Sequence, residues 1–339
     1  MELSEAGEFG VLDRIRKLCP APGGRIVIGI GDDAAMIRSR PEYSLILTTD
    51  ALAENVHFDL RYVPLEALGW KSLAVNLSDV AAMGGRPVCC LVTIGIPQRW
   101  SVEDVMKLYR GIAKGADQYE CPVAGGDMVK TSTESFVSIT VMGEVRPGAE
   151  MRRSGASPGD LLCVTGELGG ARAGLEVLQA GKEPAGDYPT SISRFLEPKP
   201  RLDEGAKLAG GLNPTSMIDI SDGLASEIRH LCEESGCGCL VFEDDIPITE
   251  ESRRWSLKKG YSPVQFAMES GEEYELLFTV NPGRLGRHLK DRHSADAVPF
   301  SVIGEMKPPD EGIRTRRGPK THPMTFMGWD HYRRTGEGA

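Results

Sequence analysis

LEALGWKSLAVNLSDVAAMGGRPVCCLVTIGI, residues 65–96, decides the fold class that we expect for this chain. The first part predicts a helix from about Leu65 to Met83, because Pro64 can open it and a Gly-Gly pair can end it. The second part is an apolar run typical of a buried strand. A helix followed at once by a strand indicates a mixed α/β fold.

One face of this predicted helix carries polar side chains. Ser72, Asn76, Asp79 and Met83 share that face, because residues three and four apart are neighbours on a helix. Leu73 and Leu77 belong to the packed side. Asp79 is therefore expected to lie beside Asn76.

Asp79 closes one of five short segments that each end on aspartate. Four of the five follow an apolar run of strand type, so their carboxylates should lie where strands stop and loops open. The segments are Gly31-Asp32-Asp33, Thr48-Thr49-Asp50, Asn76-Leu77-Ser78-Asp79, Gly125-Gly126-Asp127 and Asp219-Ile220-Ser221-Asp222.

These carboxylates would repel one another in a shared cleft unless positive charge were present. Hard oxygen ligands suit Mg²⁺, and a phosphate-bearing substrate could complete its coordination. A single aspartate of this kind is more often a cap or turn residue. Five on similar scaffolds favour a metal site instead.

Composition indicates a two-domain protein with an acidic surface. The chain has 339 residues, of which 40% are hydrophobic and 26% charged, which is enough for two cores. Its formal net charge of -10 disfavours nucleic acid as the main partner. No apolar stretch is long enough to span a membrane and the amino terminus lacks a secretory pattern, so we expect a cytoplasmic protein.

The eight cysteines predict buried thiols. Cys232, Cys237 and Cys239 are close in sequence, but they form no C-x-x-C pair and have no obvious fourth ligand. Their spacing therefore argues against zinc. A cytoplasmic location also argues against disulfides.

A second helix is expected to begin at Ser101, where Ser101 and Asp104 resemble a capping box. Its apolar stripe has Tyr109 at the edge. Strand patterns return at 136–145. The glycine- and proline-rich segment 146–160 predicts a domain boundary, which gives domains at 1–148 and 149–339.

The second half also alternates strand and helix patterns. Expected strands cover 161–164, 217–219, 240–242, 274–280 and 299–303, and a helix is expected over 224–235. Both halves are therefore predicted to be α/β.

An oxidoreductase is the main alternative from the residues alone. Gly29-Ile30-Gly31-Asp32-Asp33-Ala34 fits the dinucleotide motif G-x-G-x-x-A, with Asp50 near the position of a ribose-binding acid. However, the segment from Ala34 to Tyr43 is too short for a crossover helix. Two aspartates would also stand where a pyrophosphate needs bare amides.

Phosphoryl transfer fits the aspartates better. The sequence has neither a P-loop nor the motifs of a protein kinase. Phosphoryl transfer requires positioning and charge neutralisation, which metals held by several aspartates can supply.

Several strings over nearly the whole chain resemble the thiamine-monophosphate kinase family, within the aminoimidazole ribonucleotide synthetase-like superfamily. The more specific ones are NLSDVAAMGG and DISDGL. The others include GDDAA (31–35), RRSGASPGD (152–160), GEEYELLF (271–278) and GWDHY (328–332).

The resemblance implies a fold, an activity and a set of site residues. The fold is two-domain α/β (α+β), with an amino-terminal domain (1–148) that binds ATP and magnesium and forms a homodimer, and a carboxyl-terminal domain (149–339) that completes the active site. The activity is a phosphotransfer from ATP to thiamine monophosphate, with several Mg²⁺ ions. The implied metal ligands are Asp32, Thr48, Thr49, Asp50, Asp79, Asp127, Asp219 and Asp222. The implied ATP contacts are Tyr109, Gly126, Asp127, Arg153 and Ser221.

The resemblance also implies that His57, Glu272 and Trp329 contact thiamine monophosphate. The chemistry fits, because a tryptophan ring and a glutamate both suit a cationic thiazolium. The family's usual Gly-Gly-Glu-Asp-Tyr-Glu is Ser270-Gly271-Glu272-Glu273-Tyr274-Glu275 here. A sister ATP-dependent synthetase of purine synthesis and an inactive nucleotide-binding protein are the other interpretations.

Overall fold

The computed structural model describes residues 14–15, 17–19, 26–28, 36–37, 40–181, 185–288 and 298–328. The chain divides into two compact units. The first contains residues 1–150 and 196–206, and the second contains 151–195 and 207–339. The return of 196–206 to the first unit is a feature that no sequence pattern indicated.

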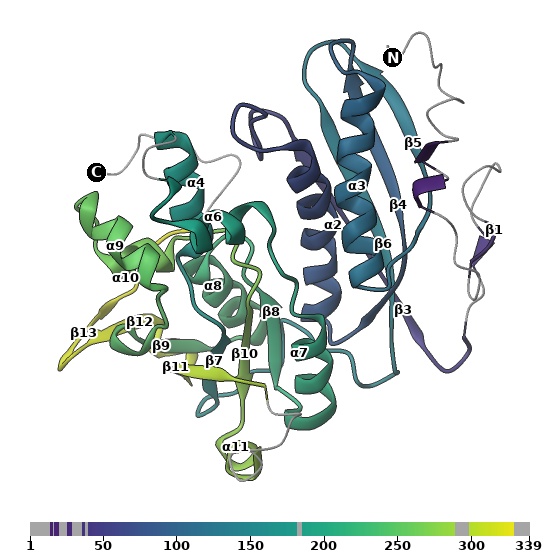
Figure 1. Ribbon diagram of the computed structural model, residues 1–339. Coiled ribbons are helices and arrows are strands. Elements are labelled where there is room, and N and C mark those ends of the chain that lie inside the picture. The colour runs from purple at the N-terminus through teal and green to yellow at the C-terminus, as the bar shows by residue number, and fades with distance from the viewer. Residues whose placement is uncertain are drawn as a thin grey trace. The chain divides into compact units, whose positions relative to one another are not determined.

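The first unit is a four-stranded sheet with two long helices on one face (Figure 1). The strand order is β3-β6-β4-β5, in which only the β4–β5 pair is parallel. The strands are β3 (Ser44–Ala53), β4 (Arg86–Pro97), β5 (Val123–Thr131) and β6 (Phe136–Val145). The short strands β1 (Ile26–Ile28) and β2 (Met36–Ile37) form a separate antiparallel pair.

Both helices expected in this unit are confirmed. Helix α2 spans Leu65–Ala82, and helix α3 spans Val102–Gln118. The capping box at the start of α3 is present: the Asp104 carboxylate accepts from the Ser101 amide at 3.1 Å, and the Asp104 amide donates to the Ser101 hydroxyl at 3.3 Å. Tyr109 belongs to the buried side of α3 and not to its edge.

Glycines allow α2 and α3 to approach closely. A Cβ on Gly69 of α2 would collide with the Leu108 carbonyl oxygen of α3. A Cβ on Gly111 of α3 would collide with the Glu66 carbonyl oxygen of α2. The two backbones therefore touch where they cross, and α2 is buried on almost every side.

The segment 196–206 is attached to the same helices. The Trp70 indole N–H donates to the Pro198 carbonyl at 2.8 Å. Lys114 of α3 forms an ion pair with Glu197 at 2.9 Å. Long-range contacts of this kind have no local signature in the sequence.

The second unit is built on a seven-stranded sheet of order β13-β12-β9-β11-β7-β10-β8. All described neighbours in this sheet are antiparallel except β12 and β9. The strands are β7 (Leu161–Thr165), β8 (Ser216–Asp219), β9 (Gly238–Phe242), β10 (Leu276–Val280), β11 (Phe300–Lys307), β12 (Ile313–Arg317) and β13 (Lys320–Pro323).

Helices connect these strands and pack on them. Helix α8 covers Leu224–Ser235 as expected, and its apolar residues join β7, β8 and β10 in one core. The other helices of this unit are α4 (Gly170–Ala180), α6 (Pro189–Leu196), α9 (Glu250–Lys258), α10 (Pro263–Met268) and α11 (Pro282–His288). Helix α7 (Leu202–Lys207) lies almost entirely in the segment 196–206 of the first unit.

The expected mixed α/β class is confirmed in both units. Strand ends differ from the expected ones by a few residues: β10 begins at Leu276, two residues after the predicted start at Tyr274. Tyr274 has a left-handed backbone with φ of 52°, which a strand cannot contain. Seven cysteine thiols are buried, and Cys237 is half-buried. Within the described part of the chain, no helix has the length and apolarity to cross a membrane.

We expect Gly111→Ala to destabilise the first unit. The new methyl group would meet the Glu66 carbonyl, so the free energy of unfolding should fall by about 1–3 kcal/mol despite alanine's better helix propensity. Gly115→Ala is a matched control on the same helix, because its Cβ would meet side chains and no backbone: Leu73 Cδ2 at 3.2 Å and the Trp70 ring at 3.6 Å. Urea unfolding measures both, and equal stabilities would contradict the close crossing of α2 and α3.

Candidate active site

Three predicted metal ligands of the first unit lie at one place, between β3 and α2. The Thr48 hydroxyl donates to Asp79 Oδ2 at 2.5 Å. The Asp50 amide donates to Asn76 Oδ1 at 2.9 Å, and Asn76 donates in turn to the Ser72 carbonyl at 3.0 Å. The polar face expected on the helix is therefore the face that meets β3.

Thr49 lies on the other face of β3, because side chains alternate along a strand. Its hydroxyl donates to the Ile139 carbonyl at 3.2 Å and accepts from the Thr140 hydroxyl at 3.1 Å. The structure thus places Thr49 apart from Thr48 and Asp50. Asp32 lies outside the described residues.

Asp127 is at the opposite edge of the same sheet. Asp50 pairs with Ile139, Ile139 with Val92, and Val92 with Gly126, so the four residues stand at one level across β3, β6, β4 and β5. Three strand spacings correspond to about 14 Å along the sheet. One copy of this sheet therefore does not bring Asp127 to Asp50.

Position 126 requires a glycine. A Cβ at this position would collide with the Val92 carbonyl oxygen of the neighbouring strand. The Asp127 carboxylate accepts from the Met128 amide at 2.9 Å and is exposed. Tyr109 is only 5% exposed, and burial raises the pKa of its hydroxyl. Its contact with ATP stays a prediction.

His57 lies in a tight turn that follows β3. Its Nδ1 accepts from the Ala53 amide at 3.1 Å, which leaves the proton of the neutral ring on Nε2. Asn55, in the same turn, has a left-handed backbone with φ of 66°. The turn therefore holds the imidazole in one orientation.

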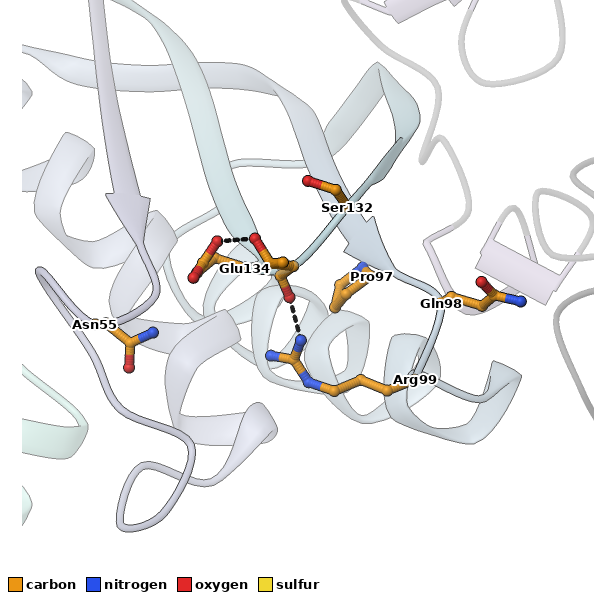
Figure 2. A pocket seen from close by; sticks show the side chains of 7 residues that line it. Asn55, Pro97, Gln98, Arg99, Ser132 and Glu134 are labelled. Carbon is orange, nitrogen blue, oxygen red and sulfur yellow. Dashed lines mark hydrogen bonds between the residues drawn. The ribbon is translucent and has the colours of Figure 1, made fainter.

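A shallow pocket of 380 Å³ lies beside this turn and is shown in Figure 2. Its cation, Arg99, is already engaged: it donates to the Thr133 carbonyl and pairs with the Glu54 carboxylate at 2.5 Å. This pairing leaves the guanidinium poorly suited to bind a phosphate. The pocket carries no functional assignment.

The predicted ligands of the second unit gather around the loop between β8 and α8. Asp219 ends β8 and is only 4% exposed, while Ser221 and Asp222 follow in the loop. Glu272 comes to the same loop, because its amide donates to the Ser221 carbonyl at 2.6 Å. The turn 270–275 thus lies directly against the DISDG segment.

Glu227 is a member of this group that the sequence analysis missed. Its Oε1 accepts from the Asp222 amide at 3.0 Å and lies 3.5 Å from the Ser221 hydroxyl. Burial raises the pKa of this carboxyl to about 8, the negative charges of Asp219 and Asp222 add to the rise, and Arg153 opposes it. An acid in the first turn of a helix after Asp-Gly was the available signal.

The predicted residue Arg153 lies near this group, and so does Gly328. The exposed Arg153 acts on the Glu227 carboxyl as a nearby positive charge. Gly328 lies against Ser226 and the Asp222 carbonyl, where a Cβ would lie 2.5 and 2.6 Å from them. Trp329, the next residue, is outside the described part of the chain.

A second buried acid stands behind Glu272. Glu273 has a pKa raised to about 7 by burial, although Ser270, Arg194 and the Ala171 amide all oppose the rise. Its Oε2 has no hydrogen-bond partner. The pKa is higher in the folded than in the unfolded chain, so stability from this group is present below about pH 4.5 and is lost as the pH rises through 7.

We expect Glu273→Gln to remove this pH dependence. At pH 5 the variant and the parent should be similarly stable, whereas at pH 8 the variant should be more stable by about 3 kcal/mol. Denaturant unfolding at the two pH values measures the difference, with the exposed Glu311→Gln as control. A constant difference at both pH values would contradict the raised pKa.

The comparisons with known proteins match both units. The chain matches the family described as AIR synthase related protein, N-terminal domain, over residues 31–145, and the corresponding C-terminal domain over residues 157–315.

Relatives and solved structures agree with these domains. A thiamine-monophosphate kinase of Aquifex aeolicus is 35% identical over 98% of this chain and 100% of its own length. A crystal structure of the kinase from Stenotrophomonas maltophilia has a TM-score of 0.80 and 32% identity, covering 91% of this chain and 96% of that one. A structure of AaThiL complexed with AMPPCP and TMP has a TM-score of 0.76 and 33% identity over 98% and 99% of the two chains. The chain therefore belongs to the thiamine-monophosphate kinase family.

Proposed function

We propose that this chain transfers the γ-phosphoryl group of ATP to thiamine monophosphate with the help of several Mg²⁺ ions, giving thiamine diphosphate and ADP. The observation that carries the proposal is the crowding of Asp219, Asp222 and Glu227 around one loop, where burial raises the pKa of Glu227 to about 8 and the negative charges of the two aspartates add to the rise. A bound cation would relieve that repulsion. The relative that binds both AMPPCP and TMP supports the choice of substrates.

The donor chemistry fits magnesium. Thr48, Asp50 and Asp79 offer hydroxyl and carboxylate oxygens, which are hard ligands. Within the described ranges no group of three or more acidic, histidine or cysteine side chains is arranged to hold a metal ion. We therefore propose that substrate phosphates supply the remaining ligands. When bound, the ions would neutralise the charge of the transferred group.

The chain's own residues bind and orient the substrates. The acceptor is a phosphate oxygen that is already ionised at neutral pH, so no general base is required. Arg153 is exposed and can fork onto a phosphate of ATP. We propose that His57, Glu272 and Trp329 bind thiamine monophosphate, and that Tyr109, Gly126, Asp127 and Ser221 contact ATP.

We propose that the protein works as a homodimer through the sheet of the first unit. The side chains of Leu45 and Leu47, on the face that carries Thr49, are 50% and 70% exposed, and Leu91 of β4 is 43% exposed. Exposed apolar side chains grouped on one sheet are typical of an interface. The strand order ends at β3 and β5, whose outer edges could pair between copies.

The dimer would also explain the separation of Asp50 from Asp127. If β3 of one copy pairs with β5 of the other, the edge that carries Asp50 comes next to the partner's edge that carries Asp127, and we propose that both residues serve one metal site. Each dimer would then have two composite sites. We also propose a cytoplasmic location for the protein.

The reaction itself should depend strictly on a divalent metal. With protein, ATP and thiamine monophosphate alone, we expect mass spectrometry to detect thiamine diphosphate and ADP when Mg²⁺ is present. EDTA should abolish the products and excess Mg²⁺ should restore them. Turnover in chelator would contradict the metal dependence, and ADP without thiamine diphosphate would indicate another acceptor.

Mixing two inactive variants tests the composite site. Asp50→Asn and Asp127→Asn should each reduce kcat by orders of magnitude while the protein stays folded. After the two proteins are mixed and exchange subunits, about a quarter of wild-type activity should return, because half the dimers are mixed and each mixed dimer has one intact site. As a control, mixing Asp50→Asn with Asp79→Asn should restore nothing, because both residues lie at the same place between β3 and α2 of one copy. Absence of recovery in confirmed mixed dimers would show that each site uses one copy only.

A further inference from the structure

The turn that carries Glu272 has a strained backbone conformation. Glu272 and Tyr274 have φ of 61° and 52°, in the left-handed region. This conformation costs about 1–2 kcal/mol for each residue other than glycine. Two backbone hydrogen bonds tie the turn to the neighbouring loop: the Glu272 amide donates to Ser221 at 2.6 Å, and the Tyr274 amide donates to Ile220 at 2.8 Å. Additional contacts must keep such a turn in place.

Glu273 provides the first of these contacts. Its Oε1 accepts from the Ser270 hydroxyl at 2.5 Å and from the Ala171 amide at 3.1 Å. The Arg172 amide donates to the same Ser270 hydroxyl at 3.3 Å. These amides belong to the first turn of α4, where the helix dipole favours a negative charge. The Ser270–Glu273 pair therefore fastens the turn to α4.

Glu275 and Arg194 provide the second contact. Glu275 Oε2 accepts from the Thr165 hydroxyl at 2.7 Å. Arg194 Nη1 lies 3.7 Å from Glu275 Oε1 and 4.0 Å from Glu273 Oε2, and it donates to the Glu167 carbonyl at 2.9 Å. One guanidinium therefore lies between the two carboxylates that flank Tyr274. The turn is held from both sides of its strained residue.

We propose that Ser270, Glu273 and Arg194 are positioning residues that hold Glu272 in the orientation it needs to bind the thiazolium of thiamine monophosphate. The proposal rests on the role proposed above for Glu272. Ser270 and Glu273 are also the two positions where this chain departs from the family pattern of glycine and aspartate. Because their side chains are bonded to each other, the two departures act as a pair.

A double-mutant cycle tests the pairing. Ser270→Gly and Glu273→Asp should each raise the KM for thiamine monophosphate about three- to tenfold, the cost of one lost hydrogen bond, with little change in the KM for ATP. The double variant should lie closer to the parent than either single variant does. Gln265→Ala, which removes an exposed hydrogen bond to Glu269 on nearby α10, is the control and should change neither constant.

Further variants separate the possible failures. Glu273→Gln keeps the acceptor oxygen for Ser270 and Ala171, so it should fold and keep a KM near that of the parent. Arg194→Met should raise the KM for thiamine monophosphate as Ser270→Gly and Glu273→Asp do.

If Glu272→Gln leaves the KM for thiamine monophosphate unchanged, the proposed role of Glu272 fails. If Glu272→Gln raises that KM while Ser270→Gly and Glu273→Asp do not, the positioning proposal fails. Equal loss of affinity for both substrates, or strictly additive effects in the cycle, would also overturn it.

Discussion

The close crossing of α2 and α3 is the constraint on which the first unit depends. Glycine at 69 and 111 lets the two backbones touch, and this contact fixes α2 against the sheet. Asn76 and Asp79 of α2 then meet the Asp50 amide and the Thr48 hydroxyl at hydrogen-bond distance. A wider crossing would move α2, and Asp79 with it, away from Thr48 and Asp50, because packed interiors transmit displacements.

The second unit brings its cluster of acidic side chains together in a different way. Its acidic residues come from the end of a strand (Asp219), two loops (Asp222 and Glu272) and the first turn of a helix (Glu227). The Ser221 and Ile220 carbonyls tie the two loops together by accepting from the Glu272 and Tyr274 amides. Burial raises the pKa of Glu227, and the charges of Asp219 and Asp222 add to the rise, so the folded chain disfavours the ionised form of this carboxyl. Proteins keep such destabilising arrangements where a ligand repays the cost of assembly.

The clusters of acidic residues in the two units differ in how many of their members could be predicted from the sequence. The polar face of α2 follows from helical periodicity, and Asp219 and Asp222 follow a recognisable strand, so these residues were predictable locally. For Glu227 the sequence offered only a weak signal, an acid in the first turn of a helix after Asp-Gly. What makes it part of the group is the hydrogen bond that it accepts from the Asp222 amide and its burial, which depend on the folded structure. The family resemblance grouped Thr49 with Thr48 and Asp50, whereas alternation along β3 turns its side chain to the opposite face.

The α/β class, the helix expected from about Leu65 to Met83, the start of the next helix with its capping box at Ser101, and the family could all be inferred from the sequence, since these depend on periodicity, caps and motifs that are local in the chain. Only the tertiary structure decided the strand order β3-β6-β4-β5, which separates Asp50 from Asp127, and the attachment of 196–206 to the first unit. It also decided the left-handed turn at Glu272 and Tyr274 and the ion pairs that hold it. These features depend on contacts between residues far apart in the chain, and no local pattern encodes which distant partner a strand edge, a buried carboxylate or an arginine will meet.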